Sequence, residues 1–110
     1  MYYQTIVLTL LSNGSKIVVV IVLLLLKEIE KILPEIAKNE SETVSLLSAD
    51  KYENISFYVY PLAAFIKREY LKKGDVIYAL FINSGITSKT DMLIFITKLL
   101  YIYSKQNPDA

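Results

Sequence analysis

The sequence predicts a small α+β domain in the order ββαββαβα, with a small mixed or antiparallel sheet, two substantial helices and one short helix. Three observations favour this fold. An Asn13-Gly14 pair separates two apolar runs, which is the strongest short hairpin signal. The run Ile17 to Val22 is β-branched throughout and favours a strand. Apolar residues then recur at helical spacing in residues 25–38 and again near the C-terminus.

The composition fits one domain, residues 1–110, and removes several kinds of chemistry. Hydrophobic residues make up 54% of the chain, enough for a sizeable core, and the net charge is +1. The chain has no cysteine for disulfides or thiolate metal sites, and no histidine, the commonest general base. We therefore expect no enzyme, no cofactor and no metal site. Many Tyr, Ile and Lys with few Gly is a usage seen in AT-rich genomes and some thermophiles.

Two apolar runs near the N-terminus, residues 5–11 and 17–26, raise the question of a membrane span. A spanning helix needs roughly 20 apolar residues, and the polar stretch 12–16 divides these two runs. Residues 1–4 contain no charged side chain, whereas a signal peptide requires positive charge before its apolar run. We expect a cytoplasmic protein without a membrane span.

The first half of the chain begins with the predicted hairpin, whose strands are residues 2–11 and 16–25. From Leu25 onward, apolar residues are spaced 4, 3 and 4 positions apart as far as Ile36, which predicts an amphipathic helix over residues 25–38. Pro34 should kink this helix or begin a second short turn.

The second half contains three further strand candidates, at residues 43–47, 55–60 and 76–82. Between the last two, residues 62–71 are predicted to form the short helix, with Gly74 beyond it as a stop. Ser84-Gly85 turns the chain after the last strand. Ser88 stands three residues before Asp91, as in a capping box, so the last helix should begin there and run to about residue 105.

Few residues of this chain are candidates for chemistry. Asp75 and Asp91 are the best placed carboxylates for acid–base work, but each adjoins a structural boundary where Asp favours local hydrogen bonding. Both are interpreted as structural. The one dense basic cluster, with Tyr70 inside it, is interpreted either as a solvated helix face or as a nucleic-acid patch. It consists of Lys67, Arg68, Lys72 and Lys73.

Part of the chain resembles PDZ domains of the bacterial protease type. The similar residues are Leu71 to Leu80, Asn83 to Ser88, the helix from Thr90, and the opening hairpin Thr9 to Ile17. Because that hairpin closes such domains, the resemblance implies a circularly permuted order. It also implies a module that binds a protein or peptide by β-augmentation. The partner strand would lie against Thr43, Val44, Ser45, Leu46, Leu47, Met92, Ile96 and Leu99.

A second resemblance is to the AbrB/SpoVT-like swapped-hairpin family of DNA-binding proteins. Residues Ile55 to Tyr78 are similar to it, with Pro61 opening a helix and Lys73-Gly74-Asp75 leading into a strand. This resemblance implies a DNA-binding homodimer that uses the basic cluster. A structural or assembly protein of unrelated α+β fold is the third alternative.

The last helix predicts self-association. Its apolar residues cover more than the stripe of a little over 100° that a monomeric surface helix usually has. The surplus residues should form the interface of a homodimer, unless the helix at residues 25–38 covers them within the chain. They are Ile94, Phe95, Tyr101 and Ile102.

Overall fold

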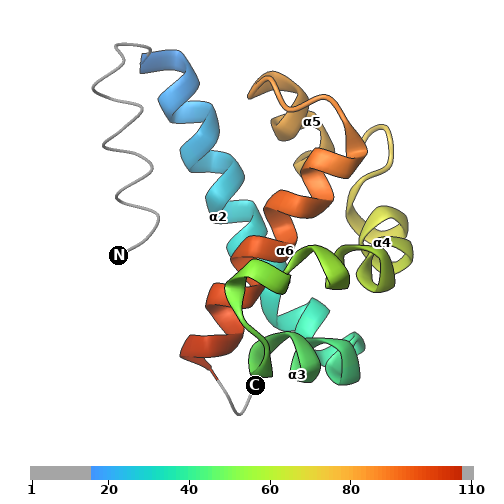
Figure 1. The fold of residues 1–110 in the computed structure, drawn as a ribbon. Coiled ribbons are helices and arrows are strands. Elements are labelled where there is room, and N and C mark those ends of the chain that lie inside the picture. The colour runs from blue at the N-terminus through green and yellow to red at the C-terminus, as the bar shows by residue number, and fades with distance from the viewer. Residues whose placement is uncertain (1–15, 108–110) are drawn as a thin grey trace.

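The computed structural model describes residues 16–107, and every regular element in that range is a helix (Figure 1). The α+β prediction and the order ββαββαβα are therefore wrong. The elements, in chain order, are α2 (Lys16–Asn39), α3 (Ser41–Ala49), the 3₁₀ turn η1 (Tyr52–Asn54), α4 (Ser56–Tyr70), α5 (Val76–Asn83) and α6 (Lys89–Gln106).

Helix α2 replaces the second strand of the predicted hairpin. It is 24 residues long and includes the β-branched run. From Val19 onward its buried residues recur every three or four positions, through Leu25 and Ile29 to Ile36. A β-branched residue loses only a few tenths of a kcal/mol of helix propensity, far less than burial of its side chain returns. The other predicted strand, residues 2–11, and the Asn13-Gly14 turn lie outside the described residues.

The three other predicted strands are also helical. Residues 43–47 lie in α3, residues 55–60 run from the last residue before α4 into that helix, and residues 76–82 lie in α5. Short apolar runs are compatible with a buried strand or a short buried helix, and periodicity alone does not separate them. Both family resemblances depend on these strands, so the PDZ-like and AbrB-like interpretations are wrong. Binding by β-augmentation is wrong for the same reason.

The helix and turn predictions were more successful. Residues 25–38 lie within α2, which continues through Pro34, and residues 62–70 form the second half of α4. The Ser88 hydroxyl accepts a hydrogen bond from the Asp91 backbone amide at 3.3 Å and caps α6 as predicted. Gly74, with φ +99°, lies in the turn between α4 and α5.

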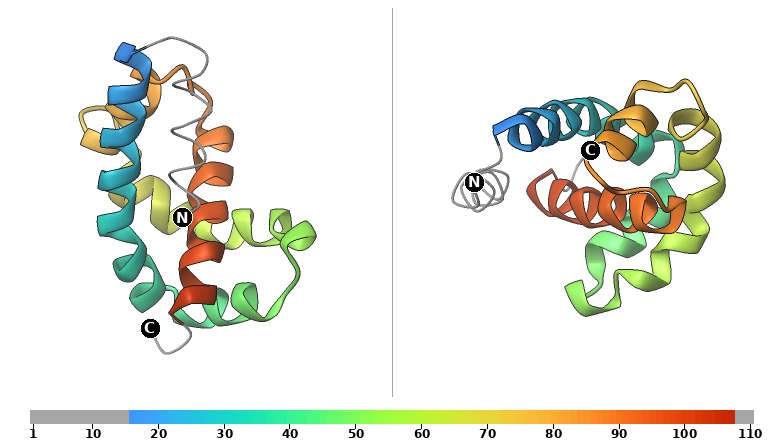
Figure 2. Two further views of the ribbon diagram at one scale, coloured as in Figure 1. Left: turned by 90° about the vertical axis from the view of Figure 1, so that its left-hand side faces the viewer. Right: turned by 90° about the horizontal axis from the view of Figure 1, so that it is seen from above.

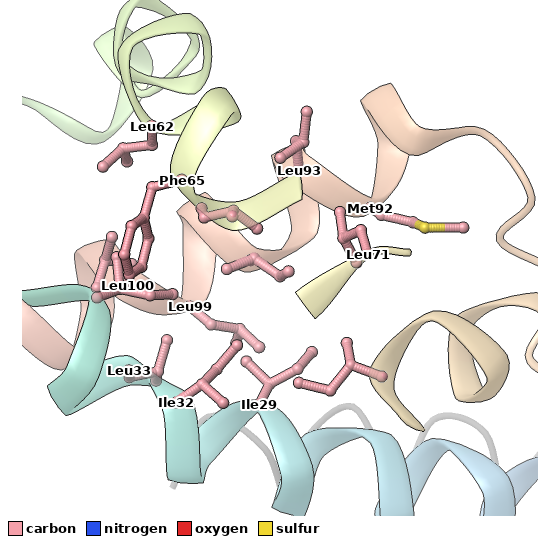
Figure 3. Packing of buried hydrophobic residues seen from close by; sticks show 14 of the residues in the cluster. Ile29, Ile32, Leu33, Leu62, Phe65, Leu71, Met92, Leu93, Leu99 and Leu100 are labelled. Carbon is pink, nitrogen blue, oxygen red and sulfur yellow. The ribbon is translucent and has the colours of Figure 1, made fainter. Parts of the chain in front are cut away.

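Helix α6 lies at the centre of the fold and packs against α2, α3 and α4. Figure 2 shows α2 and α6 running alongside each other, with α5 beside α2. Figure 3 shows the core between them, where Ile29 and Leu33 of α2, Phe65 of α4 and Leu99 of α6 lie close together. In the described part of the chain, no helix is long and apolar enough to cross a membrane.

Candidate interaction surface on helices α4 and α6

The residues proposed to hold a partner strand do not line a common groove. Met92, Ile96 and Leu99 are at most 2% exposed and belong to the core. In α3, Val44 and Leu47 are also buried, Thr43 is half-buried, and Ser45 and Leu46 are exposed. The structure therefore divides this set between the core and the outer side of α3.

The residues proposed as a dimer patch lie along the outer side of α6. Ile94, Phe95, Tyr101 and Ile102 are all half-buried. The Phe95 ring packs edge-on against Phe81 of α5, with ring centroids 5.5 Å apart. The Tyr101 ring packs in the same way against Tyr52 of η1, at 5.9 Å. Neighbouring elements therefore cover part of this patch, and its remainder flanks the exposed Lys98.

Three exposed aromatic side chains gather at η1 and the first two turns of α4. We call Tyr52, Phe57 and Tyr60 the aromatic surface. Their exposed fractions are 49%, 71% and 89%. Residues 56–66 contain no charged side chain, although one side of this helix faces outward. This part of the described chain therefore has an apolar exterior, as does the side of α2 that carries the exposed Val20, Leu23 and Leu24.

An apolar groove runs beside the aromatic surface, between α4 and α6. One part of about 220 Å³ is lined by Tyr52, Ile55, Val59 and Ile94, with Glu53, Ser56 and Lys98 at its edges. A second hollow of about 280 Å³ shares Ile94 and Lys98 and continues past Phe95 to Ile86 and Asp91. Together we call them the α6 groove. Ser56 lines this groove, and Tyr60 lies one turn further along the same side of α4 without being part of the lining.

Asp50 holds η1 in place beside this groove. Its carboxylate accepts hydrogen bonds from the Lys51 backbone amide at 2.7 Å, the Asn54 side-chain amide at 2.7 Å and the Tyr58 hydroxyl at 2.6 Å. The Tyr101 hydroxyl donates to the Asp50 backbone carbonyl at 2.9 Å and ties the turn to α6. The hydrogen bonds donated by Asn54 and Tyr58 lower the pKa of the Asp50 carboxyl. The hydrogen bond between Tyr58 and Asp50 raises the pKa of the Tyr58 hydroxyl. This network places Tyr52 over Tyr101.

The predicted basic cluster is assembled at the far end of α4. Lys67 and Arg68 lie on the outer side of the helix, and Lys72 and Lys73 follow in the turn; all four are exposed. Arg68 pairs with Glu69 at 3.0 Å and stacks over the Phe65 ring at 5.5 Å. A nucleic-acid role for this cluster stays a prediction.

Tyr70 does not serve the basic cluster as a stacking platform. Its ring packs against Phe65, with centroids 6.0 Å apart, and its hydroxyl oxygen is buried. This burial, with a smaller effect of Glu35, raises the pKa of Tyr70. The exposed rings of Phe57 and Tyr60 lie at the other end of α4, away from the cluster.

The two predicted structural carboxylates have local roles. Asp75 accepts a hydrogen bond from the Lys72 backbone amide at 2.8 Å and closes the turn before α5. Asp91 lies in the first turn of α6, where its own backbone amide bonds to the Ser88 hydroxyl. Within residues 16–107, no group of three or more His, Cys, Asp or Glu side chains could hold a metal ion.

Sequence reasoning missed the aromatic surface because it placed residues 55–60 in a strand. Tyr58 and Tyr60 share a face in a strand, since successive side chains alternate. In α4 they are about 200° apart, so Tyr58 turns to Asp50 while Tyr60 points to solvent. A signal was present in the thirteen uncharged residues before Lys67, residues 54–66, a length better suited to a helix than to a strand.

Comparisons with protein-family models, with curated proteins and with solved structures found no match.

Proposed function

We propose that this protein is a non-enzymatic interaction module that binds an apolar helix of another protein molecule on the face formed by η1, α4 and α6. The observation that carries the proposal is the exposure of Phe57 and Tyr60, at 71% and 89%, on the same helix whose Ser56 and Val59 line an apolar groove. Full burial of one such ring contributes about 2 kcal/mol, so leaving both in water forgoes about twice that. A partner that covers them recovers this free energy.

The shape of the surface fits a helix better than an extended strand. Helical ligands present anchors at i, i+3, i+4 and i+7 to an apolar groove. The α6 groove supplies apolar walls in Val59 and Ile94, and the ring of Tyr52 lines it as well. Tyr is among the residues that most often carry the binding energy of an interface once a partner buries them.

Charges at the edges of the surface favour one kind of partner. Lys98 lies midway along the α6 groove, and the basic cluster occupies the far end of α4. In the described chain, neither Lys67 nor Lys98 forms an ion pair. A bound helix that presents acidic or aromatic side chains to these positions would therefore meet unpaired cations. Such complementarity sets orientation and rate of encounter more than affinity.

A peptide selection tests this proposal without a known partner. A displayed library of random 20-residue helices is selected on the immobilised wild-type protein. The selected sequences are then tested on the Phe57→Ser/Tyr60→Ser variant and on Val76→Ser, a matched control that is 61% exposed on α5. We expect amphipathic helices that bind wild type and Val76→Ser alike and lose at least tenfold in affinity on the double variant. Peptides that bind all three proteins equally would contradict the proposal.

A further inference from the structure

The exposed residues on the outer side of α4 have a spacing that reads the same in both directions along the helix. Phe57, Tyr60, Ala64 and Lys67 succeed one another at spacings of three, four and three residues, and all four are exposed. This is the heptad spacing of a helix that packs along a second helix. The aromatic residues occupy its N-terminal half, the small Ala64 its middle, and the cations its C-terminal end.

We infer that a second copy of this chain binds here, with the two α4 helices antiparallel about a two-fold axis at the level of Leu62. The inference rests on the proposed function and names a partner for the part of that surface that α4 forms. In this arrangement Tyr60 lies opposite Ala64 of the second copy, and Ala64 lies opposite Tyr60. A large side chain therefore meets a small one at both crossings, which allows the helices to approach closely.

The ends of the two helices are complementary as well. Phe57 lies opposite Lys67 of the second copy, with Arg68 one residue further along. A cation within about 6 Å of a ring face is attracted to it, by about 0.5–1 kcal/mol at exposed sites. Arg68 already makes such a contact in its own chain, over Phe65 at 5.5 Å. Each dimer forms this cation–ring pairing twice, once at each end.

The same charges disfavour the parallel arrangement. Two parallel α4 helices would place Lys67 beside Lys67 and the basic turns at Lys72 and Lys73 side by side. The antiparallel pair puts the two basic clusters at opposite ends of the interface. Like charges in direct opposition weaken a helix pair, so the charge pattern selects the orientation.

The area available predicts a weak dimer. A buried Phe or Tyr covers about 150–250 Å², so the exposed parts of these two rings contribute about 300 Å² per chain. The neighbouring Ser56, Pro61 and Ala64 add smaller areas. The total lies in the class of transient interfaces, below about 1,200 Å². Association should therefore appear in the micromolar range or above rather than in the nanomolar range.

Sedimentation equilibrium of the full chain, from micromolar to millimolar concentration, tests the identity of the partner. Wild type and the control Val76→Ser should form dimers. Tyr60→Ser should weaken dimerisation at least tenfold. Ala64→Arg should have the same effect, because the arginine would fill the space that Tyr60 of the second copy occupies. Both positions are exposed, so circular dichroism should show unchanged helix content in each variant.

A single spin label tests the orientation. The chain has no cysteine, so Ser56→Cys gives one labelling site per chain. In the antiparallel pair the two labels are offset along the axes by about 18 Å, because residue 56 lies opposite residue 68 and each residue rises 1.5 Å. Pulsed dipolar spectroscopy should detect this separation. Labels in near contact would indicate a parallel pair and overturn the inference.

The inference and the proposed function fail differently. A chain that stays monomeric at millimolar concentration, yet yields peptides sensitive to Phe57 and Tyr60, would overturn the inference and leave the proposed function standing. A dimer unaffected by both Tyr60→Ser and Ala64→Arg would also overturn the inference, because it would use another surface. If wild type neither dimerises nor yields peptides whose binding depends on Phe57 and Tyr60, both the inference and the proposed function are wrong.

Discussion

A matched pair of substitutions in α4 tests which side of the helix faces the core. Leu62 is fully buried, whereas Phe57, the larger side chain, is 71% exposed. Leu62→Ala removes a packed side chain and should lower the free energy of unfolding by about 3 kcal/mol. Phe57→Ala removes more atoms but leaves no cavity, and should change it by less than about 0.5 kcal/mol. For a chain of this size, the Leu62 variant should unfold about 12 °C lower than wild type.

Urea unfolding followed by far-ultraviolet circular dichroism measures both values at a concentration where the chain is monomeric. The slope with denaturant should be the same in both variants, so the difference appears in the midpoint alone. The reasoning is refuted if Phe57→Ala destabilises the protein as much as Leu62→Ala. That result would mean that α4 is rotated and that Phe57 belongs to the core, which would remove the aromatic surface.

Three further predictions follow from local contacts. The pKa of Asp50 is lowered in the folded chain, so its contribution to stability is present above its ordinary pKa of 3.8 and is lost as the pH falls through the lower folded value. Between about pH 2 and pH 6, the unfolding midpoint of Asp50→Asn should therefore depend less on pH than that of wild type. Ser88→Ala removes the cap of α6 and should cost about 1 kcal/mol in thermal or urea unfolding, whereas Ser88→Asp should restore the lost stability. If the basic cluster contacts phosphate, the wild-type protein should retard duplex DNA in gels at low salt, and the triple variant Lys67→Glu/Arg68→Glu/Lys72→Glu should not. Failure of the wild-type protein to retard DNA at low salt would rule out the nucleic-acid role.

Two of the three helices that sequence reasoning found have an apolar spacing that extends over three turns or more. Leu25 to Ile36 repeats at helical spacing, and its buried side chains confirm the side that was predicted to be apolar. The last helix was found in the same way, helped by the Ser88 cap, whose hydrogen bond forms as predicted. Long periodic helices and side-chain caps are determined by residues close together in the sequence, so they can be predicted without knowledge of the neighbouring elements.

The predicted strands failed because residue preferences were used where spacing was uninformative. Val76 to Ile82 is apolar at every position except Tyr78, which gives neither a period of two nor one of 3.6. At the end of α5, two side chains bond to backbone carbonyls one turn back: the Asn83 side-chain amide donates to the Ala79 carbonyl, and the Ser84 hydroxyl donates to the Leu80 carbonyl. β-Branched and aromatic preferences are weak next to burial, so packing against α2 decided the conformation.

The candidate site could not be predicted from the sequence because its residues become neighbours only through the correct fold. The basic cluster was identified from the sequence, since its four members lie within seven positions. The α6 groove joins Tyr52 to Ile94, and the Asp50 carbonyl meets the Tyr101 hydroxyl across 51 residues. No local pattern encodes these contacts. They require α4 to be a helix, which turns Tyr58 inward to Asp50 and leaves Tyr60 outside.

The heptad on α4 follows from the same rotation and explains why the aromatic residues and the cations belong to one surface. In a strand, Phe57 and Lys67 would be about 33 Å apart, at 3.3 Å per residue. In α4 they are about 15 Å apart on one side of a rigid rod, with Ala64 between them. A second α4 in the opposite direction spans that length and meets each feature with its complement. The helix therefore places an apolar start and a basic end on one surface, and this is the surface that the proposed antiparallel pair would use.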